Sequence, residues 1–214
     1  MDLPKVLNSD PNPGLKGKRG KRKKRSEIKE LLMLLILNRE GPVGRYRLKD
    51  LMKLSEHEGL IRQMLADLQK QGHISASKTG CILTQNGKIS LEKRLKLLNI
   101  VDIKPFDSPI LKTGLISIGV HLQNMAYKIG SVINTRDIAI RGGATGATII
   151  LFNKGKLSVP SVHPDFLSEN PGLIKKIQDS FKLEDNDVVT IVSADDEWQG
   201  YEASITIANA LSKN

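Results

Sequence analysis

Arg62 and Gln63 are two adjacent side chains whose types suit the reading of nucleic-acid bases. Arginine can donate paired hydrogen bonds to guanine, and glutamine can pair in a similar way with adenine. Both stand near the start of Glu58–Gln71, where apolar residues recur at helical spacing and leave these two facing outward. The simpler interpretation of Arg62 is an ion pair with Asp67 or another surface acid, so both interpretations stay open here.

Four further basic residues near this helix are suited to phosphate contacts, which position a protein on a duplex without reading its sequence. Lys70 faces outward on the same helix, and Lys78 lies in the following turn, "SKTG". Arg45 and Arg47 precede the neighbouring helix, where they could clamp the DNA backbone. A solvated charged face is the simpler interpretation of these two arginines.

A strongly basic segment lies close to the N-terminus, where eight of the ten residues in Lys16–Arg25 are Lys or Arg. Such a segment cannot bury apolar area and repels itself, so residues 1–25 are predicted to form a disordered arm. Contacts to DNA or RNA phosphates would make its affinity depend on salt. The candidate contact residues are Arg22, Lys23, Lys24 and Arg25. A solubilising tail is the alternative.

The net charge of +10 is concentrated in the first half of the chain. Residues 1–100 contain 22 Lys and Arg against 10 Asp and Glu, whereas residues 101–214 contain 11 against 13. This asymmetry favours two domains with different partners, one of them anionic. Cys81 is the only cysteine, and the longest apolar run, Leu31–Leu37, is far too short to cross a bilayer. We therefore expect a soluble cytoplasmic protein without a membrane partner.

Apolar spacing and capping residues between Ser26 and Leu98 predict a series of short elements. Ser26 can cap the first helix, and Ser55 with Glu58 has capping-box spacing. The first predicted helix ends at Gly41. Further predicted helices are Leu48–Leu54, Glu58–Gln71 and Lys88–Leu98, and the predicted strands are His73–Ala76 and Cys81–Thr84. Three helices followed by a hairpin is the order of a winged helix-turn-helix domain, predicted for residues 26–100.

After Pro105 and Pro109 the pattern changes to apolar strands that alternate with helices. Predicted strands are Gly114–Val120, Gly146–Phe152 and Asp187–Ala194, and predicted helices are Leu122–Ile140, one beginning near Pro171 and one using Leu211. We expect an α/β domain with a mixed sheet over residues 114–214, and an α+β fold for the chain as a whole. Residues 101–113 are predicted to be a linker.

Glycines, threonines and acids in the second half are candidates for a small-ligand site. The stretch "GGATGAT" could form a backbone nest with the hydroxyls of Thr145 and Thr148, although a helix end followed by the tight start of a strand also explains its glycines. The acids of "SADDE" follow a buried strand, where open α/β sheets hold ligands, but Asp195 or Asp196 could simply cap the next helix. Together with Arg136 and Asp137, which suit the same pocket or a subunit interface, the candidates are Gly143, Thr145, Gly146, Thr148, Asp195 and Asp196.

The sequence offers little for catalysis. Cys81 lies in the predicted hairpin, and His121 and His163 have no evident nucleophile partner. No cysteine–histidine set has zinc spacing. We therefore expect no enzymatic activity, no metal and no cofactor.

Several segments resemble known families. "GRYRLKDLM" (Gly44–Met52), "EGLIRQMLADLQKQGHI" and "LTQNGK" resemble winged-helix transcription factors. "RDIAIRGGATGATIILFNKGKLSVP" (Arg136–Pro160) and "DVVTIVSADD" (Asp187–Asp196) are similar to archaeal two-domain proteins. In that family an N-terminal winged helix precedes a C-terminal domain of unknown function, and the members are described as candidate transcriptional regulators. The resemblance covers roughly Ser26 to Leu211 and leaves the basic arm outside.

These observations predict a transcriptional regulator that reads double-stranded DNA through a winged helix. Because one winged helix contacts few base pairs, we expect a homodimer. The C-terminal domain would bind a small-molecule effector or mediate dimerisation. The alternative is a non-specific architectural DNA- or RNA-binding protein that uses the basic arm, and an enzyme with a basic tether is a more distant one.

Overall fold

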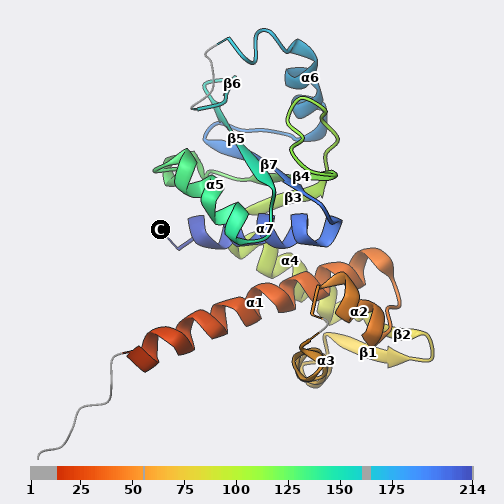
Figure 1. Ribbon diagram of the computed structural model, residues 1–214. Helices are drawn as coiled ribbons and strands as arrows, with labels where there is room; N and C mark the ends of the chain where they lie inside the picture. Colours follow the sequence, from red (N-terminus) through yellow and green to blue (C-terminus); the bar gives the residue numbers. More distant parts are fainter. Residues whose placement is uncertain (1–13, 55, 161–164, 214) are drawn as a thin grey trace, which may run out of the picture.

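The computed structural model describes residues 14–54, 56–160 and 165–213, with side chains described from Glu27 onward. A helical part with a two-stranded sheet lies below a part built on a five-stranded sheet (Figure 1). The helical part contains α1 (Gly14–Glu40), α2 (Arg45–Leu51), α3 (Glu58–Lys70), β1 (Ile74–Ser77), β2 (Gly80–Leu83) and α4 (Gln85–Leu97). The elements predicted between Leu48 and Leu98 are present within three residues of their predicted bounds.

Helix α1 differs most from its prediction. It begins at Gly14 rather than at Ser26, so the backbone of Gly14–Arg25 is helical and not a disordered arm. Residues 1–13 lie outside the described part of the chain.

The run Leu31–Leu37 is buried on all sides, with every residue at most 5% exposed. Met33, Leu34 and Leu37 are buried together with Leu31, Leu32, Leu35 and Ile36, so apolar burial extends around the whole helix. A helix that is apolar all round belongs in a core, and α1 packs against α4, β2 and α7 (Glu197–Leu211). Across the described residues, no helix combines the length and the hydropathy that crossing a membrane requires.

The large sheet is antiparallel throughout, so the prediction of a mixed sheet was wrong. Its order is β3 (Ile100–Pro105), β4 (Ile116–Leu122), β7 (Asp187–Ala194), β5 (Gly146–Asn153) and β6 (Lys156–Ser158). The central strand β7 runs opposite to both β4 and β5. Its carboxyl end therefore lies beside the beginnings of its neighbours, as the pair Ser193 and Gly146 shows.

Part of the predicted linker belongs to this sheet. Ile100–Pro105 form the edge strand β3, which pairs with β4. Only residues 106–115 connect these two strands. Helices α5 (Val132–Arg141) and α7 contact the sheet and each other, whereas α6 (Pro171–Ser180) contributes to a separate apolar cluster with Phe106 and Phe181. The short 3-10 helix η1 (Ala126–Lys128) follows β4.

One hydrophobic core joins the helical part to the sheet. It runs from α1, α3 and α4 through α7 to β4, β5 and β7. Three ion pairs support the contact: Lys29 with Glu202, Arg39 with Glu197, and Lys53 with Asp196. The Arg39 guanidinium also lies 4.8 Å from the centroid of the Tyr201 ring. The two predicted domains therefore share a packed interface.

Candidate functional site

The exposed face of α3 carries the two side chains singled out by the sequence. Ile61, Met64 and Leu68 are at most 2% exposed, which turns the opposite side of the helix to solvent. Arg62 and Gln63 are exposed, as predicted. Arg62 Nη2 donates to Glu58 Oε1 at 2.8 Å, and Gln63 Nε2 donates to Asp67 Oδ1 at 2.9 Å. The ion pair considered for Arg62 exists, but its acid is Glu58, one helical turn earlier.

Glu58 also connects α3 to the start of α2. Its Oε1 lies 3.4 Å from Nη2 of Arg45, which donates a hydrogen bond to the Tyr46 hydroxyl at 3.1 Å. The hydrogen bond from Arg62, with the charges of Arg62 and Arg45, lowers the pKa of the Glu58 carboxyl. The helix starts of α2 and α3 are thus held together by one carboxylate between two arginines.

The hairpin is attached to the residues that precede α2. Val43 and Cys81 exchange two backbone hydrogen bonds, at 3.0 and 2.9 Å. Gly80 makes this approach feasible, because a Cβ on it would lie 2.4 Å from the Val43 carbonyl carbon and its φ is +141°. Lys78 is exposed at the tip of this anchored hairpin.

The other predicted contact residues fall into two groups. Arg47 and Lys70 are exposed on α2 and α3. The backbone of Arg22, Lys23, Lys24 and Arg25 lies in α1, but their side chains are outside the described residues.

Sequence reasoning overlooked Tyr46, which is 64% exposed beside Arg45. The one feature of the sequence that could have indicated Tyr46 is its position between two arginines, Arg45 and Arg47.

Three of the predicted ligand residues meet at one pocket of about 310 Å³ in the sheet part. Arg136 on α5 and Gly146 and Thr148 on β5 line it, together with apolar residues such as Ile133 and Phe166. Nothing in the sequence indicated that apolar residues outside the glycine-rich stretch, such as Ile133 and Phe166, line this pocket, because their segments meet only in the folded chain.

The remaining predicted ligand residues do not line that pocket. Asp196 caps α7, because its Oδ1 accepts hydrogen bonds from the backbone N–H groups of Trp198 and Gln199, and its Oδ2 pairs with Lys53. The capping interpretation of Asp196 is therefore confirmed. The exposed residues Asp137, Gly143, Thr145 and Asp195 lie outside the pocket lining. Asp195 follows the end of β7, and Gly143 and Thr145 precede the start of β5.

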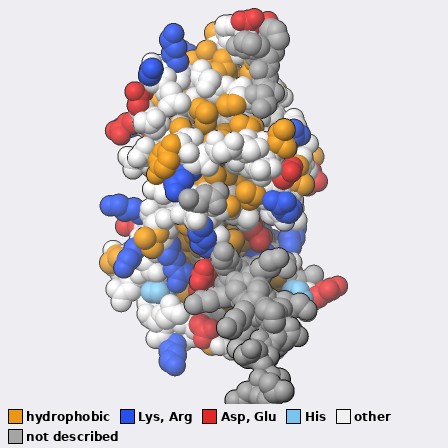
Figure 2. Space-filling model, turned by 90° about the vertical axis from the view of Figure 1, so that its left-hand side faces the viewer, with side chains coloured by type: hydrophobic (Ala, Val, Ile, Leu, Met, Phe, Trp, Pro, Cys, Tyr) orange, Lys and Arg blue, Asp and Glu red, His pale blue; other side chains and the backbone are white. Residues whose placement is uncertain are grey.

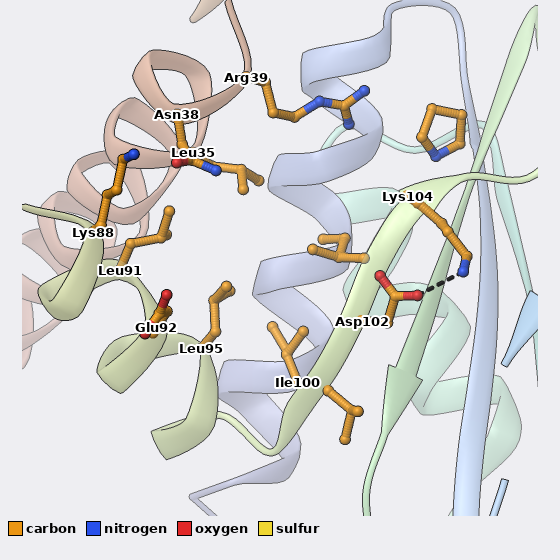
Figure 3. A pocket seen from close by; sticks show the side chains of 13 residues that line it. Leu35, Asn38, Arg39, Lys88, Leu91, Glu92, Leu95, Ile100, Asp102 and Lys104 are labelled. Carbon is orange, nitrogen blue, oxygen red and sulfur yellow. Dashed lines mark ion pairs between the residues drawn. The ribbon is translucent and has the colours of Figure 1, made fainter. Parts of the chain in front are cut away.

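A second pocket, of about 340 Å³, lies between α1, α4 and β3 (Figure 3). Its walls carry charges of both signs, including Arg39, Lys88 and Glu92, and Asp102 pairs with Lys104 at 2.6 Å. A third, of about 500 Å³, lies between α1, α4 and α7, where Arg94 pairs with Glu30 at 3.4 Å. Because both pockets contain charges of both signs that pair with each other, their linings favour no single class of ligand. Within the described residues, no cluster of three His, Cys, Asp or Glu side chains could hold a metal ion.

Comparisons with known proteins identify the sheet part but assign it no activity. A hypothetical protein from Pyrococcus horikoshii OT3 has the same fold, with a TM-score of 0.63 and 24% identity over 87% of this chain and 92% of that one. No curated protein matches the sequence. Residues 113–211 match the family described as Domain of unknown function (DUF4443). The C-terminal half of the chain is therefore similar to a domain of unknown function, in agreement with that part of the resemblance noted in the sequence.

Proposed function

We propose that residues 26–98 are a winged helix-turn-helix domain that binds double-stranded DNA, and that the protein is a transcriptional regulator. The observation that carries this proposal is the exposed face of α3, with Arg62 and Gln63 outward and an apolar face at most 2% exposed beneath them. A helix anchored in this way can enter the major groove with these two residues near base edges.

The surroundings of α3 suit a backbone clamp. Arg45 and Arg47 lie at the start of α2, which Glu58 ties to the start of α3. Lys78 extends from a hairpin that is hydrogen-bonded to Val43, two residues before α2. These cations come from two elements in contact with α3, α2 and the hairpin, and phosphate contacts from them would position α3 on a duplex.

The second candidate is non-specific nucleic-acid binding through the basic segment Lys16–Arg25. The helical backbone of this segment continues α1 outward from the body of the protein (Figure 1). A helix with eight basic residues in ten would bind any polyanion, with an affinity that falls steeply with salt. In the regulator this segment would add affinity without sequence preference. A homodimer, as predicted from the size of a single winged helix, would double the bases read.

Sequence preference distinguishes the two candidates. We expect the full chain to prefer duplexes from the DNA upstream of its own gene over shuffled duplexes, measured by fluorescence anisotropy across a salt series. The double variant Arg62→Ala/Gln63→Ala should lose about tenfold or more of that preference, because each paired base contact discriminates by about 1–3 kcal/mol. Lys175→Ala, at an exposed lysine of α6, is the control and should change nothing.

Changing Arg22, Lys23, Lys24 and Arg25 to serine should weaken binding to both kinds of duplex equally and make it less sensitive to salt. If no duplex is preferred and this variant removes nearly all binding, the winged-helix proposal is wrong. The non-specific candidate would then replace it.

Glu58→Gln should tighten DNA binding about two- to tenfold, since it removes a negative charge from the proposed interface and releases Arg62 and Arg45. The pKa of Glu58 is lowered, so the wild-type carboxylate stays ionised throughout the near-neutral range and the gain should not vary with pH there. Glu92→Gln on α4 makes the same change in net charge away from α3 and is the control. Equal gains from both variants would mean that only net charge matters.

A further inference from the structure

The pocket beside α5 opens at an incompletely paired edge of the large sheet. Strand β5 pairs with β7 along Gly146–Phe152, but β6 covers its other side only from Leu151 onward. Within the described part of the chain, no strand pairs with the first residues of β5 on that side. The pocket of about 310 Å³ occupies this place, between β5, the first turns of α5 and the segments around Ile110 and Val159.

The pocket wall is mostly aliphatic and aromatic. Ile133 and Ile110, at its margin, are 65% and 53% exposed. Figure 2 shows hydrophobic side chains gathered on this face of the C-terminal half. Burying this wall against an apolar group would be favourable. The pocket volume is at the lower end of the range for small-molecule sites, so the group that fits has only a few carbon atoms.

Among the described residues that line the pocket, Arg136 is the one charged side chain. It makes no hydrogen bond or ion pair with any residue in the described part of the chain. The hydroxyls of Thr148 on β5 and Thr113, which lies against Gly146, are further polar groups of the lining. A Cβ at Gly146 would come within 2.4 Å of Thr113 Oγ1, so the glycine is what allows this hydroxyl to lie against the strand.

We propose that this pocket binds a small aliphatic monocarboxylate, with the carboxylate paired to Arg136 and the chain against Ile133 and Phe166. A guanidinium offers two parallel N–H donors that match a carboxylate. A single cation balances a single negative charge, whereas a phosphate dianion would keep an unbalanced charge beside an apolar wall. The assignment does not depend on the DNA-binding proposal, because the ligand contacts only the sheet part.

Calorimetric titration of the full chain with hexanoate tests the assignment, with 1-hexanol and hexylamine as probes of the same chain length. We expect saturable binding of one hexanoate per chain, with both other probes about tenfold weaker or more, since neither can pair with a guanidinium. Arg136→Met should weaken hexanoate by about tenfold or more while leaving 1-hexanol unchanged. Arg141→Met, at an exposed arginine on the last turn of the same helix, should bind hexanoate like the wild type.

Three results would overturn the proposal: no saturable hexanoate binding, equal affinity for hexanoate and 1-hexanol, or unchanged hexanoate affinity in Arg136→Met. Because Arg136 and Arg141 are both exposed, neither variant should impair folding, and equal melting temperatures would verify this. DNA affinity plays no part in these readouts, so failure here and failure of the DNA-binding proposal can be told apart.

Discussion

Glu202→Gln is expected to lower the free energy of unfolding by about 3–5 kcal/mol. Glu202 on α7 pairs with Lys29 on α1 at 2.6 Å, and Lys29 is only 5% exposed. The Lys29 ammonium also donates to the backbone carbonyl of Met52 at 3.1 Å. Removing the carboxylate charge leaves a buried ammonium without its counter-ion, at the contact that joins the helical part to the sheet part.

Urea unfolding measures this effect, followed by the fluorescence of the single tryptophan, Trp198, which lies on α7. The control is Glu197→Gln, whose ion pair with Arg39 at 3.3 Å is partly open to solvent, with the Glu197 side chain 42% exposed. This control should change stability by less than about 1 kcal/mol. The double variant Lys29→Met/Glu202→Leu should recover most of the loss, because no charge is then buried. Similar losses from the two glutamine variants would contradict the assigned role of Lys29.

Asp187→Ala should cost roughly 3–5 kcal/mol, because one buried carboxylate satisfies three donors. Asp187 is 1% exposed at the start of β7. Its Oδ2 lies 2.6 Å from His121 Nε2 and accepts from the backbone N–H of Glu184 at 2.8 Å. Its Oδ1 accepts from the backbone N–H of Asn124, also at 2.8 Å. Alanine would leave a histidine and two backbone donors without their acceptor.

The comparison for this prediction is Asp185→Ala. Asp185 is exposed and accepts one hydrogen bond, from the backbone N–H of Gly155 at 3.1 Å, so its loss should cost less than about 1 kcal/mol. Thermal unfolding of both variants, converted to free energy at a common temperature, gives the difference. Comparable costs would show that the buried hydrogen bonds of Asp187 contribute little.

Local patterns in the sequence were sufficient for the short elements of the helical part, though not for the start of α1. The spacing of Ile61, Met64 and Leu68 predicted the buried side of α3 and the outward direction of Arg62, because a helix of thirteen residues needs only one apolar stripe to orient it. Leu60, which lies next to this stripe in the sequence, is 38% exposed. Helix ends were predicted well where a glycine follows, as at Gly41 and Gly72, whereas Ser26, predicted to cap the first helix, lies inside α1.

Strand partners were beyond local patterns. Continuous apolar runs identified β5 and β7 as buried strands, but an apolar run carries no direction, so the sheet was predicted to be mixed and is antiparallel. The predicted ligand site was also divided. Arg136, Gly146 and Thr148 meet at one pocket, whereas Asp196 is used as the cap of α7.

By itself the sequence determined most of the short elements between Leu48 and Leu98, which face of α3 is apolar, and that the positive charge belongs to the first half. These properties depend on residues close together along the chain. Only the tertiary structure decided that α7 covers α1, that Lys29 meets Glu202 across 173 positions, and that Glu58 links two arginines from different helices. Such contacts arise when distant elements bury their apolar faces against one another, and no periodicity within a single segment encodes the partner.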